Sequence, residues 1–222
     1  MTWRALGAAA AGIALMLLAG ATPSAAKEKP APTAAAPAPA AAYAGHVYLF
    51  RGLAGSILSK GINTFMAELD ALGIPATADS YTRWEKVANA ALAAYKADPK
   101  PGPVIIVGHS FGANAAVIMA NWLGARGVPV RLVVTFDGVR DDMPALDNSA
   151  AELIDFYKPP FGRATKVVAG FKGKVSSTSF AGRSDITHDT IDKDPELHRQ
   201  VIARIVELMK IGPKPKPKAK KT

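Results

Sequence analysis

The chain alternates between short apolar segments and longer segments in which apolar residues recur every three or four positions. The short segments are typical of β-strands; they are HVYLF (46–50), the weaker IPATAD (74–79), PVIIV (103–107) and VRLVVTF (130–136). The longer segments have the spacing of one buried helix face; they span residues 56–73, 83–97 and 112–127. The strands at 103–107 and 130–136 are apolar almost throughout, which is typical of strands covered on both faces of a sheet.

The last third of the chain has a less regular pattern. SAAELIDFY (149–157) predicts a short helix, ATKVVAGF (164–171) predicts a strand, and KVSSTSF (174–180) is a further candidate strand. A final helix is predicted after Asp194, the expected N-cap, because Pro195 suits the first helical position.

Strands and helices that alternate in this way predict an α/β fold. A mostly parallel sheet would lie between two layers of helices, as a three-layer αβα sandwich. We assign this fold to one domain, residues 45–211. In such sheets ligands bind beyond the carboxyl ends of the strands. Functional residues are therefore expected directly after strand ends.

Residues 1–26 have the parts of a secretory signal peptide. Arg4 precedes the apolar stretch ALGAAAAGIALMLLAG, and the small residues SAA stand before Lys27. The sequence therefore predicts export to the periplasm or the medium of a bacterium. The alternative is an uncleaved N-terminal membrane anchor, although the apolar stretch is slightly shorter than the roughly 20 residues that span a bilayer.

Proline-rich segments flank the predicted domain. Residues 27–44 form a Pro/Ala-rich linker, and residues 212–222 form a Pro/Lys-rich tail that is predicted to be disordered and extended. The formal net charge is +9, of which the five tail lysines, residues 27–29 and Arg4 supply seven, leaving +2 for residues 45–211. This near balance argues against a nucleic-acid partner. For the tail, a solvated end and weak contact with an anionic envelope surface both stay open.

The chain has no cysteine. Disulfides, thiolate catalysis and Cys-zinc sites are therefore excluded. An exported protein of this composition must be held together by its core alone, which suits a bacterial envelope protein.

One serine stands where a strand is predicted to become a helix. Ser110 follows the apolar run at 103–107 by two residues, within Gly-His-Ser-Phe-Gly, and Gly108 and Gly112 leave room for a close approach of strand and helix. A turn this sharp strains one residue and holds its hydroxyl out at the sheet edge. The helix N-terminus directs free N–H groups at the same place, where they can stabilise an oxyanion.

With this motif the chain resembles the α/β-hydrolase superfamily, in its lipase, esterase and thioesterase-like branches. The resemblance covers about residues 45–210. It implies a compact α/β-hydrolase fold in which Ser110 is the nucleophile. An acid and then a histidine would follow in chain order to complete a catalytic triad.

A serine nucleophile needs a base, and four histidines are available. His46 precedes the first strand, His109 lies within the turn with its ring expected to point away from Ser110, and His198 falls in the last helix. His188 lies in a loop after the last strand-like segment, where the resemblance places the catalytic histidine. We therefore predict His188 as the base.

Several aspartates are candidates for the acid. We predict Asp137 as the acid, because it directly follows the strand at 130–136 and from there could orient His188. Asp185 and Asp189, which flank His188, are alternatives. Weaker candidates are Asp141, Asp142 and Asp155.

The resemblance also implies two backbone N–H groups that bind the oxyanion. One is that of Phe111, and the other belongs to the loop after the first strand, at Leu53 or Gly52. Many relatives have His-Gly in this loop, whereas this chain has Arg51 before Gly52. Arg51 is expected either to form a local salt bridge or to contact an anionic group of the substrate.

The sequence thus predicts an exported serine hydrolase that cleaves an acyl ester or thioester through an acyl-enzyme, with neither metal nor organic cofactor. Residues 140–163 would form either a small lid or acyl pocket, or ordinary helix packing. Two alternatives stay open. One is an envelope acyltransferase on the same fold, and the other is a non-catalytic envelope-binding protein.

Overall fold

The computed structural model describes residues 43–53, 55, 59–98 and 101–210. In chain order the elements are β1 (His46–Arg51), α1 (Lys60–Ala71), β2 (Ala76–Ser80), η1 (Tyr81–Arg83), α2 (Trp84–Ala97), β3 (Val104–His109), α3 (Phe111–Gly124), β4 (Val130–Phe136), β5 (Glu152–Tyr157), β6 (Lys174–Ser179), η2 (Ile191–Lys193) and α4 (Pro195–Met209). The predicted signal peptide, nearly all of the linker and the tail lie outside the described residues. Within those ranges, no helix combines the length and apolar character that a membrane span requires.

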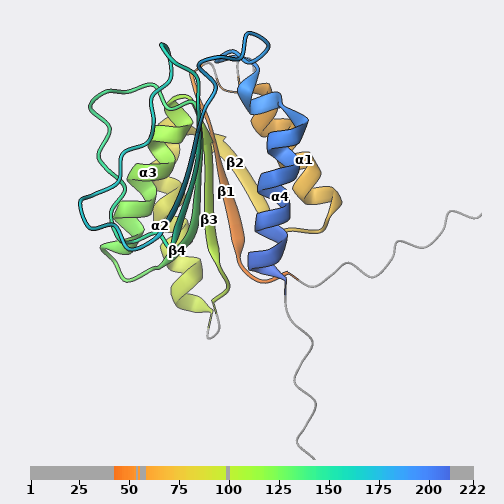
Figure 1. Ribbon diagram of the computed structural model, residues 1–222. Coiled ribbons are helices and arrows are strands. Elements are labelled where there is room, and N and C mark those ends of the chain that lie inside the picture. The colour runs from red at the N-terminus through yellow and green to blue at the C-terminus, as the bar shows by residue number, and fades with distance from the viewer. Residues whose placement is uncertain (1–42, 54, 56–58, 99–100, 211–222) are drawn as a thin grey trace, which may run out of the picture. The chain divides into compact units, whose positions relative to one another are not determined.

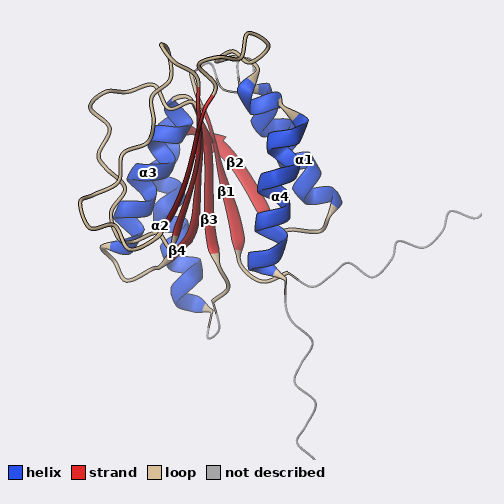
Figure 2. Ribbon diagram, viewed as in Figure 1, coloured by secondary structure: helices blue, strands red, loops and turns tan. Residues whose placement is uncertain are grey.

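The six strands form one parallel sheet in the order β2-β1-β3-β4-β5-β6. Helices α1 and α4 lie on one face of the sheet and α2 and α3 on the other (Figures 1 and 2). This arrangement confirms the predicted α/β sandwich. From β1 the chain crosses to β2 on one side, whereas β3 and the later strands extend the sheet on the other side. The resulting switch point, between β1 and β3, is where open parallel sheets bind ligands.

Alternating side chains of the central strands fill two apolar cores. In β3, Ile105 and Val107 pack toward α1 and α4, while Val104 and Ile106 pack toward α2 and α3. Because side chains alternate along a strand, a strand covered on both faces must be apolar at every position. This requirement explains the unbroken apolar runs in β3 and β4.

Two glycines let helix α3 start directly against the strands. A β-carbon at position 112 would lie 2.1 Å from the carbonyl oxygen of Phe50 in β1, and one at position 108 would lie 2.0 Å from the carbonyl oxygen of Gly112. Any larger residue at either position would push α3 away from β1 and β3. The close approach fixes the helix N-terminus at the carboxyl edge of the sheet.

The sequence prediction was wrong in two segments after β4. Residues 152–157 form strand β5 and not a helix, and Leu153 and Phe156 are buried in the core. Residues 164–171 form no strand, because their only ladder contact among the described residues is a single bridge between Val167 and Leu146. The candidate strand at 174–180 does exist as β6, an edge strand with every residue exposed.

The connections before and after β5 contain no helix. They run as loops, drawn in tan in Figure 2, and Leu146, Val167 and Phe171 from these loops pack into the core on the α2 and α3 face. Much of the region 140–163 is therefore a core strand and its adjoining loops. The prediction of helix packing there was wrong. In the last helix, by contrast, the Asp194 carboxylate accepts hydrogen bonds from Glu196 and Leu197, as expected of its N-cap.

Candidate active site

Ser110 occupies the turn between β3 and α3. Its backbone has φ 60° and ψ −125°, a conformation that L-residues rarely adopt. Its amide donates to the carbonyl oxygen of Phe136 in β4 at 2.9 Å, which holds the turn against the next strand. The strained turn is the local geometry that the glycine-flanked serine predicted.

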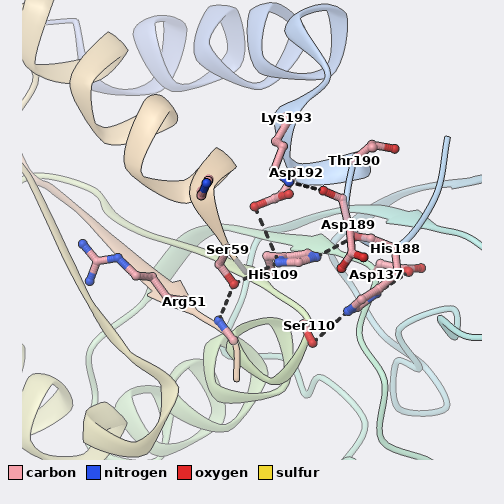
Figure 3. A network of polar contacts seen from close by, with 12 residues as sticks. Arg51, Ser59, His109, Ser110, Asp137, His188, Asp189, Thr190, Asp192 and Lys193 are labelled. Atoms are coloured by element: carbon pink, nitrogen blue, oxygen red, sulfur yellow. Dashed lines mark hydrogen bonds and ion pairs between the residues drawn. The ribbon is translucent and has the colours of Figure 1, made fainter. Parts of the chain in front are cut away.

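Residues from three distant segments meet at this turn, as Figure 3 shows. The Nε2 atom of His188 lies 3.1 Å from Ser110 Oγ, and its Nδ1 atom lies 2.7 Å from Asp137 Oδ2. The His188 side chain is 19 % exposed, whereas that of Asp137 is fully buried. The structure thus brings together the three side chains that the sequence analysis selected, in the order serine, imidazole, carboxylate.

The backbone around Asp137 holds its carboxylate in a fixed orientation. Asp137 itself has φ 53°, and its Oδ1 atom accepts a hydrogen bond of 2.5 Å from the amide of Lys158. Gly162 provides the space, because a β-carbon there would lie 1.6 Å from Oδ1. One carboxylate oxygen is therefore held by the backbone, and the other is left to face His188.

Two aromatic rings flank the His188 imidazole. The His109 ring centroid lies 4.8 Å away on the buried side, and the Phe161 ring centroid lies 4.4 Å away. Phe161 is 60 % exposed, so it stands between His188 and solvent. These contacts restrict the rotation of His188 and favour the orientation that points Nε2 at Ser110.

None of the other candidate acids contacts His188. Asp155 is buried in β5, where its carboxylate accepts hydrogen bonds from Thr135, Thr165 and Ser177. The three exposed candidates with side-chain partners pair with arginines: Asp141 with Arg163, Asp142 with Arg140 and Asp185 with Arg183. The hydrogen bond from Arg183 lowers the pKa of Asp185 to about 2. The Asp189 side chain forms no hydrogen bond or ion pair within the described part of the chain.

The loop after β1 passes directly over Ser110. A β-carbon at Gly52 would lie 2.8 Å from the β-carbon of Ser110. The Gly52 amide already donates to Ser59 Oγ at 2.8 Å, so of the two predicted donors in this loop Leu53 is the one with an uncommitted N–H among the described contacts. The Phe111 amide is likewise uncommitted there, as expected for the first residue of a helix.

Arg51 does not form the local salt bridge that was one of its two predicted interactions, as far as the described residues show. Its guanidinium donates to Asn63 Oδ1 at 2.6 Å and to the carbonyl oxygen of Ala78 at 3.1 Å. These are local hydrogen bonds, not a salt bridge. Figure 3 shows the side chain directed away from Ser110.

Three further residues lie next to the site: Ser59 and Asp192, which the sequence analysis missed, and His109, which it considered only as a base and set aside. The ring of His109 is buried beneath His188 and contacts Ser59 Oγ at 3.1 Å and Asp192 Oδ2 at 3.5 Å, both through Nδ1. Ser59 had been placed inside a predicted helix and Asp192 in a loop. No sequence signal links positions so far apart, because only the tertiary fold brings them together.

Burial shifts the pKa of both members of the His109–Asp192 pair. It raises the pKa of the Asp192 carboxyl and lowers the pKa of the His109 imidazole. Each residue attracts charge onto the other, but desolvation is the larger effect for both. The neutral forms of both groups are therefore favoured.

The other two histidines lie away from Ser110. His46 contacts Thr77 at the amino end of β1. His198 is buried in α4, where Nδ1 contacts Glu68 and Nε2 donates to the carbonyl oxygen of Asp192. His198 is therefore a buried packing residue of α4 and takes no part in the contacts around Ser110.

One cavity opens at Ser110, and a second adjoins it at Phe111. One of about 200 Å³ is lined by Leu53, Ser110, Phe161 and His188. A larger one of about 500 Å³ shares Phe111 with the first and is lined mainly by apolar side chains, among them Tyr81, Trp84, Ile118 and Met143. Its volume is within the range of small-molecule pockets. In the described residues, no group of three or more His, Asp or Glu side chains is arranged to hold a metal ion.

A family model described as Thioesterase domain matches residues 40–157 of the chain. No curated protein matches this chain. A solved protein from Xanthomonas campestris pv. campestris assigned to the α/β-hydrolase superfamily is 16 % identical, with a TM-score of 0.43, over 72 % of this chain and 99 % of that one. RedJ, a thioesterase of the prodiginine biosynthetic pathway in Streptomyces coelicolor, is 13 % identical with a TM-score of 0.43. The match covers 80 % of this chain and 96 % of that one. The NocB thioesterase domain from the nocardicin cluster is 14 % identical with a TM-score of 0.45. The match covers 74 % of this chain and 95 % of that one.

Gly162→Ala should reduce activity strongly, because the new methyl group would occupy the position of Asp137 Oδ1. We expect a fall in kcat of about 10²-fold, as follows from small displacements of reacting groups. Steady-state kinetics on a short-chain acyl ester would measure it. Gly182→Ala, where a β-carbon meets nothing within 4 Å, is the control and should retain wild-type kcat. Equal activity of both variants would contradict the role assigned to Gly162.

Asp192→Asn should change how stability depends on pH. Because folded Asp192 keeps its proton to a higher pH than the unfolded chain, unfolding releases a proton above about pH 3.9. The free energy of unfolding of the wild type should therefore fall, relative to that of Asp192→Asn, as the pH rises from about 4 through the raised pKa. The groups that face position 192 are the same in both proteins, namely His109, Lys193 and the amides of Gly61 and Ile62. Urea unfolding at several pH values tests this, and a difference that does not vary with pH would contradict it.

Proposed function

The chain belongs to the thioesterase domain family, a branch of the α/β-hydrolase superfamily, and we propose that it is a serine hydrolase that cleaves an acyl thioester or ester through an acyl-enzyme. The observation that carries the proposal is the continuous contact from Ser110 Oγ through His188 to Asp137, at 3.1 and 2.7 Å. A serine hydroxyl is a weak nucleophile by itself, and a neighbouring imidazole held by a carboxylate is the arrangement that activates it.

In the first half of the reaction, Ser110 Oγ attacks the acyl carbon while His188 Nε2 takes the hydroxyl proton. Asp137 accepts the Nδ1–H hydrogen bond, which keeps Nε2 free as a base and stabilises the imidazolium that forms. The carbonyl oxygen becomes an oxyanion, and the amides of Leu53 and Phe111 are the proposed donors to it. When the tetrahedral intermediate collapses, the thiol or alcohol leaves with the proton from His188.

In the second half, water replaces the leaving group. His188 takes a proton from the water molecule as its oxygen attacks the acyl carbon of the Ser110 ester. The second tetrahedral intermediate uses the same two amides. Its collapse breaks the bond to Oγ, His188 returns the proton to Ser110, and the carboxylic acid is released.

The larger cavity is the proposed site for the acyl group. It begins at Phe111, directly after the nucleophile, and the aromatic rings of Tyr81 and Phe111 stack there at 5.2 Å. An apolar acyl chain would gain free energy from burial against these rings, by about 25 cal/mol for each Å² of apolar surface removed from water. Among the described residues that line it, Arg140 and Asp142 are the only charged ones, and they pair with each other.

Substitutions of the three residues should separate this assignment from its alternatives. We expect Ser110→Ala and Asp137→Asn each to lower kcat on acyl esters and acyl thioesters by about 10⁴-fold. Ser110→Ala should also abolish labelling by a fluorophosphonate probe. Asp185→Asn is the matched control, since Asp185 was the competing acid and pairs with Arg183; its kcat should remain within about threefold of the wild type. A kcat that falls with Asp185→Asn and not with Asp137→Asn would overturn the choice of acid.

We further infer that the protein is exported, on the sequence of residues 1–26 alone. Expressed in a bacterium, the mature chain should begin at Lys27. Intact mass measurement and N-terminal sequencing of the protein from the periplasmic and membrane fractions test this. A full-length chain that retains Met1 in the membrane fraction would support the anchor alternative instead.

A further inference from the structure

His109 links two loops of the proposed active site through its buried ring. Its Nε2 atom lies 2.9 Å from the carbonyl oxygen of His188, and its Nδ1 atom lies 3.1 Å from Ser59 Oγ. Ser59 Oγ in turn accepts the Gly52 amide at 2.8 Å. The side chains of both His109 and Ser59 are almost fully buried. A continuous polar path thus joins the loop after β1 to the backbone of His188, as the dashed lines in Figure 3 show.

The direction of each hydrogen bond in this path follows from chemistry. The carbonyl oxygen of His188 can only accept, so Nε2 of His109 must carry the proton. In the neutral ring, which burial favours, Nδ1 is then an acceptor, and the Ser59 hydroxyl donates a hydrogen bond to it. Ser59 Oγ keeps a lone pair for the Gly52 N–H. Every donor in the path therefore meets one acceptor, in a single arrangement.

Asp192 lies behind this path and supports that arrangement. Its carboxyl is fully buried, 3.5 Å from His109 Nδ1, and neither oxygen has a hydrogen-bond partner within the described residues that meets ordinary geometry. An ionised Asp192 would draw a proton onto Nδ1, which could then no longer accept from Ser59. Burial raises the pKa of the Asp192 carboxyl and lowers that of the His109 imidazole, so it opposes this proton transfer.

We propose that His109 is a positioning residue for hydrolysis, which holds the oxyanion loop at Gly52 and Leu53 and the backbone of His188 in one fixed relation to Ser110. The inference rests on the proposed function. His109 does not reach the reacting atoms; it acts through Ser59 on one side and through the His188 carbonyl on the other. Since it directly precedes Ser110 in the chain, one residue ties the nucleophile turn to both loops.

The geometry predicts a specific kinetic effect. The held groups are those that act on the transition state, namely the proposed oxyanion donor at Leu53 and the base, whereas the acyl cavity lies on the other side of Phe111. Loosening the two loops should therefore lower kcat and leave KM nearly unchanged. A small displacement of reacting groups can cost about 10²-fold in rate.

Two substitutions at position 109 separate its two contacts. The side-chain nitrogen of glutamine reaches as far as Nε2 of histidine and can donate to the His188 carbonyl, while that of asparagine reaches only as far as Nδ1. We expect His109→Gln to retain kcat within about fivefold and His109→Asn to lose about 10- to 100-fold, with KM within about threefold for both. Ser59→Ala should lose kcat similarly, because it removes the acceptor of the Gly52 amide, which His109→Gln leaves in place. The double variant His109→Asn/Ser59→Ala should lose little more than either single variant, because the two residues belong to one path.

The experiment measures kcat, KM and the urea midpoint of each variant on one acyl ester, beside the wild type and Ser110→Ala. Wild-type kcat in His109→Asn or Ser59→Ala, or a loss equal in His109→Gln and His109→Asn, would overturn the inference. So would a loss of kcat that is fully explained by unfolding, since that is a purely structural role. If His109→Asn does not fold, Ser59→Ala and Ser59→Thr decide the question: threonine keeps the hydroxyl and should restore kcat. Full activity of Ser110→Ala would instead overturn the proposed function itself, and this inference with it.

Discussion

The close contact between the first turn of α3 and the ends of β1 and β3 determines where every other part of the site lies. Two glycines allow it: Gly112 lies against the Phe50 carbonyl, and Gly108 lies against the Gly112 carbonyl. With no room for a gradual turn, the residue between strand and helix takes a strained conformation, and that residue is Ser110. The free amides of the helix N-terminus are then fixed next to its hydroxyl.

The register of the parallel sheet brings Gly52 and Asp137 beside Ser110. Strands β1, β3 and β4 are neighbours, and all of them end at the same edge. Gly52, Ser110 and Asp137 each follow one of these strands directly, so the register of the sheet brings them together. His188 reaches the same edge from the loop before α4, where Asp137, His109 and Phe161 hold its ring and backbone. The site is therefore rigid where the sheet forms it and depends on hydrogen bonds where the loop enters.

Local sequence was enough to predict the parts of the site that follow strand ends. Ser110 and Asp137 come directly after apolar runs, and such positions can be recognised without knowing the fold; His188 was selected by chain order and by the resemblance. Sequence patterns failed where packing decides. Residues 152–157 contain good helix formers, yet they form β5. As a strand beside β4 they bury side chains on both faces of the sheet. The contact of Ser59, His109 and Asp192 could not be predicted, because these residues lie up to 133 positions apart and meet only in the folded chain.

We propose that His188 activates Ser110 and that the amides of Leu53 and Phe111 bind the oxyanion. The most direct test is a crystal structure of the protein after reaction with a fluorophosphonate, whose phosphonyl group has the tetrahedral geometry of the intermediate. We expect phosphorus to be bonded to Ser110 Oγ. The unesterified oxygen of the phosphonyl group should lie within hydrogen-bonding distance of the amides of Leu53 and Phe111. A phosphonyl group bonded to any other residue, or an oxygen that faces away from both amides, would contradict it.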